Sequence, residues 1–501
     1  MEGKVWLVGA GPSNIGLFTL KGKQVLEEAE VVVYDRLVGL EILSMIPNDA
    51  KQIDVGKVSG NHTVPQSEIN QILLEEALKG KRVVRLKGGD PFLFGRGAEE
   101  LTLLIEHQVP FEIVPGVTSA ISVPAYNGIP VTHRDYASSL HIITGHKKQG
   151  SSYDIDFEAL VRIKGTLVFL MGVRSLGEIC KGLEKAGMGK DMPAAVLENG
   201  TTSKQRKVVA TISTLEKKVK EAEIGSPAII VIGNVCQLSE ELMWYEKLPL
   251  MGKKILVTRP KEVISEISIR LRKQGAEVLE LPCIKYKEIE HNIRFAEALK
   301  NIKKYNWIVF TSPKAVKVFF KELKQQNIDI RIMFGIYFAA IGEVTNKALR
   351  ECGIYADVVP SVFDSVSLGK ELLKVCQGGD KILLPRALKG GNEILQELEK
   401  IPQVSIQDIP IYDTIYATNH SEQIIKEIEN DTLDYAVFTS ASTVKGFVEV
   451  VKKIDYGKVK AVCIGTKTKA AAESYGMRTY VAEEASLEQI EHLLIKLSTE
   501  N

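Results

Sequence analysis

Short apolar segments alternate with amphipathic, helix-like stretches along the whole chain. Most of the apolar segments consist mainly of valine, isoleucine, leucine and phenylalanine, and they end at glycine, proline, aspartate or a Thr-Ser pair. Continuous apolar strands are typical of parallel sheets that helices cover on both faces. The pattern predicts an α/β protein with several open sheets, whose ligands bind beyond the carboxyl ends of the strands. The predicted strands include Lys4–Val8, Val31–Tyr34, Arg82–Leu86, Thr166–Met171, Ala228–Ile232, Lys254–Thr258, Trp307–Phe310, Lys381–Leu384 and Tyr435–Phe438.

The segment Tyr245–Gly252, which contains Pro249 and ends in glycine, marks the clearest domain boundary. It separates the strand that ends at Ile232 from a new strand that begins at Lys254. A weaker boundary at Pro115-Gly116 divides the first half. At roughly 150 residues per domain, a chain of 501 residues has three or four folding units. We therefore expect one domain at 1–247, with lobes of about 1–115 and 116–247, and a second domain at 248–501.

The second half contains an internal repeat. The segments VFTSPKAVKVFF and VFTSASTVKGFV, at Val309–Phe320 and Val437–Val448, share a strand, a Thr-Ser turn and the start of a helix. Each copy continues with an Ile-Gly-x-x-Thr turn and then with a serine near acidic residues. Any one of these features is common in βα units, but their shared order predicts two similar lobes. The later features begin at Ile341 and Ser365 in the first copy and at Ile464 and Ser486 in the second.

The charges are balanced, with 64 lysine and arginine residues against 63 aspartate and glutamate residues and a formal net charge of +1. This balance argues against a general attraction to nucleic acid or to an acidic membrane, so an anionic ligand requires a local basic cleft. The six cysteines are scattered without a C-x-x-C pair, and the histidines lack H-E-x-x-H spacing. We therefore expect neither a disulfide framework nor a metal site. We recognise no signal peptide or membrane-length apolar segment, which predicts a cytoplasmic protein.

The first strand leads into VGAGP, which partly matches a dinucleotide-binding loop. The next strand ends in an acidic residue, Asp35, at about the distance that such a loop requires. However, Asn14 occupies the place of the third glycine, and Pro12 has no backbone N–H to offer a pyrophosphate. Binding of NAD is therefore disfavoured.

A longer motif, RLKGGDPFLFGRGAEE, follows the strand at Arg82–Leu86. Its glycines allow a ligand to approach the backbone closely, and Asp90 offers a carboxylate to an ammonium group or to ribose hydroxyls. It belongs to a collinear series over residues 1–245 with VGAGP, VVVYDRLV, VGK, TVPQSEIN, VPGVTSA, AYNGIPVTHRDY, TGH, LVFLMGV and LENGTTSKQRKV. In this series the chain resembles the tetrapyrrole (class III) methyltransferases, and most closely the uroporphyrinogen-III C-methyltransferases. The resemblance implies a two-lobed fold, S-adenosylmethionine between the lobes, and a homodimer.

The resemblance also implies roles for individual residues. Asp35 and Lys57 match the base and the acid that move protons when a pyrrole carbon is methylated. The cations for an octacarboxylate substrate, each of which could equally be a surface residue, match Arg36, Arg96, His133, Arg134 and Arg206. The cofactor positions match Pro12, Gly88, Gly89, Asp90, Leu93, Thr118, Ser119, Met171 and Gly200. Where the family usually has Gly-Asp after GAGP, this chain has Ser13-Asn14, which predicts an altered loop geometry.

Residues 250–501 resemble uroporphyrinogen-III synthase through VTRP, GAEVLELPCI, VFTSPKAV, AAIGEVT, LLPRA, IPIYDT, VFTSAS and CIGTKT, in that order. The resemblance implies two flavodoxin-type parallel-sheet lobes, one of about 250–284 plus 412–501 and one of about 285–411. They would close hydroxymethylbilane with inversion of ring D, without a cofactor and mostly by positioning, while Tyr412 helps water to leave. The candidate substrate contacts, whose Ser and Thr members are also good helix N-caps, are Arg259, Ser312, Lys314, Thr345, Arg386, Ser440, Ser442, Lys467 and Thr468.

The two resemblances predict a bifunctional enzyme that converts hydroxymethylbilane into uroporphyrinogen III and methylates it at C2 and C7 to precorrin-2, for sirohaem or cobalamin. One alternative is a methyltransferase fused to a two-lobed tetrapyrrole-binding or sensory module without activity. Another keeps the class III fold but methylates RNA or a protein side chain, against which the balanced charge and the complete motif series argue. Beyond the two substrates and a second copy of the chain, we expect no nucleic-acid, membrane or metal partner.

Overall fold

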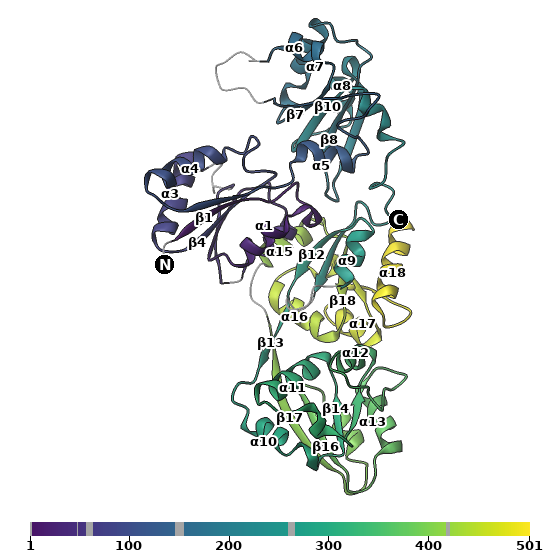
Figure 1. The fold of residues 1–501 in the computed structure, drawn as a ribbon. Coiled ribbons are helices and arrows are strands. Elements are labelled where there is room, and N and C mark those ends of the chain that lie inside the picture. Colours follow the sequence, from purple (N-terminus) through teal and green to yellow (C-terminus); the bar gives the residue numbers. More distant parts are fainter. Residues whose placement is uncertain are drawn as a thin grey trace. The chain divides into compact units, whose positions relative to one another are not determined.

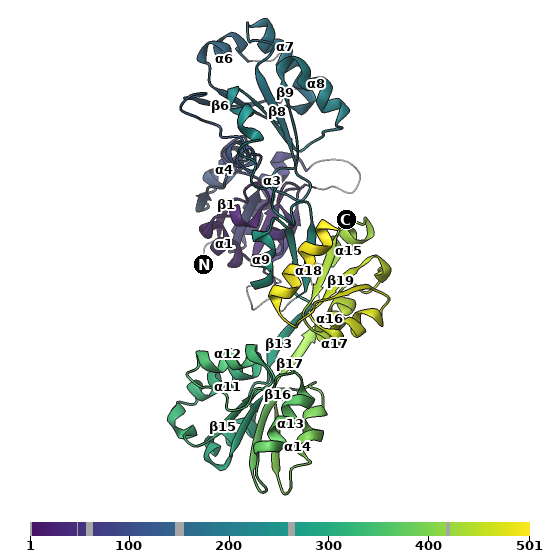
Figure 2. The same ribbon diagram turned by 90° about the vertical axis from the view of Figure 1, so that its right-hand side faces the viewer.

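The computed structural model describes residues 3–47, 49–56, 64–145, 155–258, 266–416 and 421–500. It contains four five-stranded sheets (Figures 1 and 2). The chain forms two compact units, and the first comprises Met1–Arg259, Ile264–Leu281 and Thr418–Asn501. The second unit is built around Pro282–Ala417. Three sheets therefore belong to the first unit and one to the second.

The first sheet is parallel throughout and has the order β3-β2-β4-β1-β5. Successive side chains of β1 point to opposite faces of the sheet and pack into two different cores, because side chains alternate across a strand. Val5 and Leu7 pack with α3 and α4, whereas Val8 packs with α1 and α2. The strands are β1 (Lys4–Gly9), β2 (Val31–Tyr34), β3 (Lys51–Asp54), β4 (Arg82–Lys87) and β5 (Phe111–Val114), and the helices are α1 (Leu20–Glu27), α2 (Leu40–Leu43), α3 (Gln66–Leu78) and α4 (Gly97–Glu106).

The second sheet, with the order β6-β7-β10-β8-β9, is mixed rather than parallel. Its β10 runs antiparallel to both neighbours, and only β6 and β7 run parallel. The expectation of parallel pairing is wrong for this sheet, because continuous apolar strands indicate burial on both faces and not direction. The strands are β6 (Leu140–Thr144), β7 (Thr166–Leu170), β8 (Pro193–Glu198), β9 (Arg206–Thr211) and β10 (Ala228–Ile232), and the helices are α5 (Ser119–Tyr126), α6 (Phe157–Ile163), α7 (Leu176–Lys185) and α8 (Ile212–Glu221).

The third sheet is parallel and joins segments that are far apart in the sequence, in the order β12-β11-β18-β19-β20. Helices α9 and α18 cover one face, where Ile267, Leu271, Ile490 and Leu494 are buried. We call this sheet and its helices the third-sheet lobe. It contains β11 (Lys254–Thr258), β12 (Glu277–Leu281), β18 (Tyr435–Phe438), β19 (Lys460–Cys463), β20 (Arg478–Val481), α9 (Glu266–Lys273), α15 (Ser421–Glu429), α16 (Ala441–Val451), α17 (Thr466–Glu473) and α18 (Leu487–Thr499).

The fourth sheet forms the second unit, with the order β13-β17-β16-β14-β15. It is parallel except for its edge strand β13, which runs antiparallel to β17. Helices α10 to α12 pack on one face and α13 and α14 on the other. The elements are β13 (Ile284–Glu288), β14 (Trp307–Phe310), β15 (Tyr337–Ala340), β16 (Lys381–Ala387), β17 (Ser405–Tyr416), α10 (Ile293–Lys300), α11 (Pro313–Gln325), α12 (Glu343–Glu351), α13 (Ser365–Val375) and α14 (Glu393–Leu398).

The internal repeat is confirmed as two matching strand–turn–helix units. Ser312 after β14 and Ser440 after β18 both cap the next helix, with φ of −163° and −167°. Gly342 and Gly465 precede α12 and α17 with the same extended backbone. The later serines differ, because Ser486 caps α18 whereas the residue before Ser365, Asp364, caps α13.

In the described part of the chain, six short 3-10 helices lie between the larger elements: Ile15–Leu17, Val173–Ser175, Asn234–Ser239, Ile302–Lys304, Ile330–Met333 and Tyr456–Lys458. Among the described residues, the helices are too short or too polar to span a bilayer.

Candidate active sites

Glycine backbone from three loops meets at the carboxyl edge of the first sheet. The N–H of Gly11 donates to the carbonyl of Gly89 at 3.1 Å, and the N–H of Gly89 donates back to Gly11 at 2.8 Å. A β-carbon at Gly9 or Gly116 would collide with the backbone of the facing loops. Only glycine permits this approach, so the VGAGP, GGDP and VPGV motifs form one junction.

Asp90 holds this junction together. One carboxylate oxygen accepts the N–H groups of Phe92 and Leu93, at 2.8 and 3.1 Å. The other accepts the N–H of Gly116 at 3.0 Å. The sequence suggested that Asp90 binds an ammonium group or ribose hydroxyls, but in the structure its carboxylate ties the GGDP turn to the third loop. We therefore keep Asp90 as a cofactor-site residue that orders the backbone.

The residues around the junction fit S-adenosylmethionine. Gly89 has φ of +68°, and among the described residues no atom lies within 4 Å of where its β-carbon would be. Met171, after β7, is 53% exposed, which is high for a large apolar side chain at a strand end. Leu93 packs on the core of the second sheet. Open backbone beside uncovered apolar side chains suits a ligand with polar ends and an adenine ring.

Two further segments from the second sheet reach this region. Thr118 caps α5 and places Ser119 at the first turn of that helix. The loop after β8 contains Gly200, where a β-carbon would overlap Val123 of α5. In the same loop the hydroxyl of Thr201 donates to the carbonyl of Pro12 at 2.6 Å. The predicted cofactor residues thus occupy loops that contact one another.

The departure at Ser13-Asn14 has a structural consequence. Ser13 adopts φ of +94°, a region that glycine occupies without strain and serine rarely does. Asn14 caps the short helix that follows, since its side chain accepts the N–H of Gly16 at 2.8 Å. Ser13 therefore takes a left-handed backbone conformation, and Asn14 fixes the start of the short helix.

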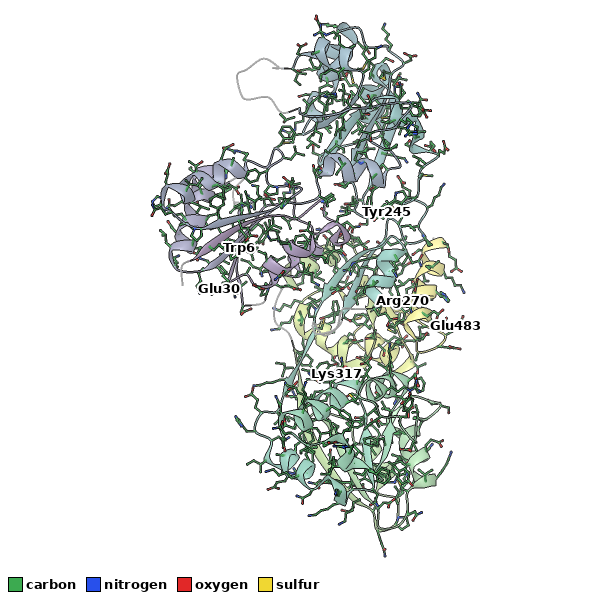
Figure 3. The ribbon with its side chains drawn as sticks, in the orientation of Figure 1. Trp6, Glu30, Tyr245, Arg270, Lys317 and Glu483 are labelled. Carbon is green, nitrogen blue, oxygen red and sulfur yellow. The ribbon has the colours of Figure 1, made fainter. Side chains whose placement is uncertain are left out.

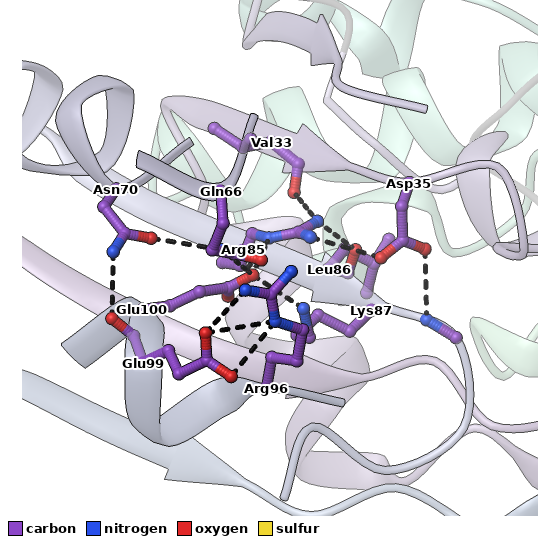
Figure 4. A network of polar contacts seen from close by, with 11 residues as sticks. Val33, Asp35, Gln66, Asn70, Arg85, Leu86, Lys87, Arg96, Glu99 and Glu100 are labelled. Carbon is purple, nitrogen blue, oxygen red and sulfur yellow. Dashed lines mark hydrogen bonds and ion pairs between the residues drawn. The ribbon is translucent and has the colours of Figure 1, made fainter. Parts of the chain in front are cut away.

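A network of buried charges holds Asp35 (Figure 4). Asp35 follows β2, and its carboxylate accepts Arg85 Nη2 at 3.2 Å and the N–H of Gly88 at 3.4 Å. Arg85, on the neighbouring strand β4, is 2% exposed and also donates to both oxygens of Glu100. Lys87 Nζ donates to Glu100 at 2.7 Å. The network therefore fixes the carboxylate of Asp35 against the GGDP turn.

The sequence analysis did not single out Arg85, Lys87 or Glu100. The sequence does contain a signal for Arg85 and Lys87, because they interrupt the buried part of β4, whose other residues, Val83, Val84 and Leu86, are apolar. Buried cations require a partner, and Glu100 is fully buried between them. Burial lowers the pKa of Lys87 below its ordinary value. The identity of the partner could not be read from the sequence, since it lies on a helix that follows a turn of nine residues.

The predicted substrate cations of the first half differ in availability. Arg36 and Arg134 are exposed. Arg96 adopts φ of +58° and pairs with Glu99, with Nη2 to Oε2 at 2.6 Å. His133 is half-buried, and its Nδ1 accepts the N–H of Asp135 at 3.1 Å. Arg206, the first residue of β9, donates to Glu198 and to the carbonyls of Ala222 and Glu223 after α8, so its contacts are structural.

Two predicted residues, Lys57 and Arg259, lie outside the described residues. Their predicted roles as catalytic acid and as substrate contact therefore stay predictions. The third-sheet lobe contains four more candidates, Ser440, Ser442, Thr468 and Lys467, of which Lys467 is exposed. Ser440 caps α16 and exchanges a hydrogen bond with Ser442 at 2.9 Å, and Thr468 is 4% exposed in the first turn of α17.

The second unit brings together two residues that are 100 positions apart. The hydroxyls of Ser312 and Tyr412 lie 2.8 Å apart. Tyr412 is 4% exposed, and its ring meets Tyr286 edge-on at 5.5 Å. Burial raises the pKa of Tyr412, so its phenol keeps its proton at neutral pH. A phenol with a hydroxyl partner is suited to donate a hydrogen bond or a proton to a leaving oxygen.

Other candidates in the second unit have internal roles. Arg386 on β16 is 7% exposed and makes a two-point contact with Asp408, with both distances 2.7 Å. It also donates to the carbonyl of Gly391 at 2.5 Å. Lys314 lies 3.3 Å from Glu288, and Thr345 is 2% exposed in α12. Arg386 therefore braces the end of β16 rather than presenting a free guanidinium.

Comparison with known proteins defines the class of each half. A model of the tetrapyrrole (corrin/porphyrin) methylases matches residues 4–216, and a model of uroporphyrinogen-III synthase HemD matches residues 265–491. The porphyrin biosynthesis protein HemD of Ruminiclostridium josui is 47% identical over 500 residues, which cover 100% of this chain and 99% of that protein. The chain therefore belongs to the family in which a tetrapyrrole methylase and a uroporphyrinogen-III synthase are joined in one polypeptide.

Two further similarities are to methyltransferases. The uroporphyrinogen-III C-methyltransferase of Bacillus subtilis is 43% identical over 331 residues, which cover 66% of this chain and 68% of that protein. A solved structure of uroporphyrin-III C-methyl transferase from Thermus thermophilus, complexed with S-adenyl homocysteine, is 38% identical. It covers 47% of this chain and 99% of its own, with a TM-score of 0.41. The methylase half is an S-adenosylmethionine-dependent methyltransferase.

Proposed function

We propose that this chain converts hydroxymethylbilane into uroporphyrinogen III and then methylates that product at C2 and C7 to precorrin-2. The family membership of both halves over the full chain supports the pair of reactions. The observation that carries the proposal is the convergence of the predicted cofactor loops at the Gly9–Gly89–Gly116 junction next to Asp35. The matched family also disfavours an inactive tetrapyrrole-binding module in the second half.

In the methylase half, S-adenosylmethionine supplies an electrophilic methyl group. A pyrrole carbon would take that methyl group as the bond to the sulfonium sulfur breaks, S-adenosylhomocysteine would remain, and the ring would then lose a proton. Asp35 is the base that we assign to this proton, because Arg85 and the Gly88 N–H hold its carboxylate in one orientation. Lys57 is the assigned acid. The exposed Arg36 and Arg134 are the side chains that we assign to substrate carboxylates.

In the synthase half, a hydroxyl leaves hydroxymethylbilane as water and the macrocycle closes with ring D inverted. Tyr412 is the group that we assign to protonate the departing hydroxyl, with Ser312 orienting its phenol. Positioning of the reacting ends supplies most of the acceleration, because one weak acid accounts for only part of it. Ser440 and Thr468 in the third-sheet lobe are the proposed carboxylate contacts at helix N-termini.

One experiment tests both activities. The full chain receives hydroxymethylbilane with and without S-adenosylmethionine, and the products are analysed for porphyrin isomer and methyl count. Type III product without cofactor and dimethylated type III product with cofactor are expected. Type I isomer alone would contradict the synthase assignment, whereas unmethylated type III product in the presence of cofactor would contradict the methyltransferase assignment.

We also propose that the protein is a cytoplasmic homodimer that associates through the methylase half. The described cysteines form no disulfide with one another, which fits a reducing compartment. Light scattering of the purified chain gives the oligomeric state, and a monomer across the micromolar range would contradict the dimer. We place the functional boundary between the halves at residues 247 and 248, and the boundary between the synthase lobes near residues 284 and 412.

A further inference from the structure

Two polar anchors connect the methylase half to the third-sheet lobe, and both lie in the same compact unit. In the first, Arg272 Nε of α9 donates to Glu41 Oε1 of α2 at 2.8 Å. The same oxygen accepts the N–H of Val278, on the edge strand β12, at 3.3 Å. In the second, the hydroxyl and the N–H of Ser203 donate to Glu277 Oε2 at 2.6 and 3.0 Å.

The first anchor fixes the far end of the segment that begins at Asp35. In this segment, the side chain of Leu37 packs against Gly88, where a β-carbon would lie 2.7 Å away. Gly39 packs against the carbonyl of Ser13 at the same distance. The segment Asp35–Glu41 is therefore in contact with both the GGDP turn and the VGAGP loop. Its end is held by a residue of the synthase half, since Glu41 is 7% exposed and pairs with Arg272.

The second anchor holds the loop that follows β8. Asn199 and Thr201 have φ of +48° and +68°, which non-glycine residues keep only when their surroundings impose it. Thr201 donates its hydroxyl to Pro12, and its N–H donates to Gln205 at 2.8 Å. Ser203 lies between these contacts and is bound by Glu277 from the third-sheet lobe. Glu277 thus supports a loop that reaches the predicted cofactor site.

We propose that Arg272 and Glu277 of the synthase half are positioning residues for the methylation reaction. Arg272 acts through Glu41 on the segment that carries Asp35, and Glu277 acts through Ser203 on the loop that carries Gly200. Catalytic geometry requires support from residues behind the reacting groups, and here part of that support comes from the other enzyme of the fusion. The proposal rests on the proposed function of the methylase half.

The test uses the full-length chain with uroporphyrinogen III and S-adenosylmethionine supplied directly, and it compares Arg272→Met with Ser203→Ala. Because Arg272 acts on the Asp35 segment, Arg272→Met should lower kcat of methylation about fivefold or more while the KM for S-adenosylmethionine stays nearly constant. Because Ser203 acts on the Gly200 loop, Ser203→Ala should raise that KM about threefold or more with a smaller change in kcat. Calorimetric titration with S-adenosylhomocysteine should show the same weakening for Ser203→Ala.

Arg270 is the matched control on the same helix (Figure 3). Its ion pairs are with Glu266 and Glu491, both in its own lobe. Arg270→Met should therefore leave both methylation constants within about twofold of wild type. Arg272→Lys, which keeps a cation for Glu41, should recover part of the lost kcat.

The outcomes separate the proposal from its premise. Constants within about twofold of wild type for both Arg272→Met and Ser203→Ala would overturn it. If Arg272→Met also lowers the melting temperature and synthase activity, Arg272→Lys and Ser203→Ala decide the question. A change mainly in kcat for Arg272→Lys and mainly in the KM for S-adenosylmethionine for Ser203→Ala supports the proposal. An equal loss of methylation and synthase activity in both variants contradicts it. A wild-type chain that fails to methylate uroporphyrinogen III contradicts the proposed function instead.

Discussion

Asp35 and Tyr412, the catalytic candidates that the structure describes in the two halves, are held in different ways. Asp35 is bound by Arg85, and behind Arg85 lie Lys87 and the fully buried Glu100. Tyr412 is held by the hydroxyl of Ser312 and by the ring of Tyr286. The methylase candidate thus has a charged support, whereas the synthase candidate has a neutral one. A charged support orients a carboxylate firmly, but removal of one member leaves an uncompensated buried charge and strongly destabilises the fold.

The largest loss of activity should follow the neutralisation of Asp35. Asp35→Asn keeps the shape and an acceptor for Arg85, but it removes the base. Methylation should therefore fall about 10²- to 10⁴-fold, as is usual for a general base. Product analysis by methyl count measures the effect. Formation of the type III isomer in the same sample is the control, and its parallel loss would contradict separate supports for the two sites.

The charged support should also dominate stability. Glu100→Ala leaves Arg85 and Lys87 without their shared carboxylate, so the first unit should lose about 3–5 kcal/mol of unfolding free energy. The neighbouring Glu99→Ala is the matched control, because Glu99 is exposed and its ion pair is with another exposed residue, Arg96. It should cost less than about 1 kcal/mol. Urea denaturation of the two variants compares them, and equal losses would show that Glu100 is not a structural centre.

The neutral support should give a smaller effect on activity. Tyr412→Phe removes the phenol hydroxyl and leaves the ring packed against Tyr286. Cyclisation of hydroxymethylbilane should slow about 10- to 100-fold, less than for a reaction that depends mainly on a general acid. The rate of uroporphyrinogen III formation measures this. An unchanged rate would remove Tyr412 from the mechanism and leave positioning alone.

The buried carboxylate of Glu41 tests whether a single cation, Arg272, can offset the cost of burying a charge. Glu41 pairs with Arg272, yet burial raises its pKa to about 6. A raised carboxyl pKa means that the folded state binds the proton more tightly than the unfolded state. The stabilising contribution is then complete below the ordinary value near 4.5 and is lost as the pH rises through 6.

Glu41→Gln should remove this pH dependence. Its unfolding free energy relative to wild type should increase by up to about 2 kcal/mol between pH 4.5 and pH 7.5, because 1.36 kcal/mol corresponds to one pKa unit. Thermal denaturation at both pH values measures the difference. A relative stability that stays constant, or that falls with pH, would show that Arg272 fully compensates the burial.

The smallest effect on stability is expected for the helix caps in the two copies of the internal repeat. Ser312→Ala and Ser440→Ala each remove a helix N-cap, which costs about 1 kcal/mol. Each change also removes a hydroxyl partner, but Tyr412 is buried whereas Ser442 is exposed, so Ser312→Ala should cost roughly 1 kcal/mol more. Chemical denaturation of both variants checks the difference. Equal costs would mean that the Ser312–Tyr412 contact adds nothing to stability.

The local structure of these regions could be predicted from the sequence. Continuous apolar segments predicted the strands, and the Thr-Ser turns predicted the caps at Ser312 and Ser440. The pattern does not contain the direction of a strand. The antiparallel pairing in the second sheet could therefore not be predicted from it. The predicted cofactor positions came from a resemblance, and the structure shows that their loops meet.

The partners of individual charges could not be predicted. Arg386 matched a substrate contact in the sequence, but it pairs with Asp408 because the register of β16 and β17 places Asp408 beside Leu384, two residues away on the strand. Similarly, only the packing of α4 on the first sheet shows that Glu100 serves Arg85 and Lys87. Pairing between distant elements depends on register and docking, which a single sequence does not display.

The strand order of the third sheet also determines when this sheet can fold during synthesis. Its strand β11 lies between β12, which follows directly, and β18, which the ribosome adds only about 150 residues later. At roughly 5–20 residues per second, one edge of β11 waits some ten to thirty seconds for its neighbour. During that time the whole of the fourth sheet is made. The nascent chain must therefore complete the inserted unit before the surrounding one can close, and a chaperone that shields an open strand edge would act at this stage.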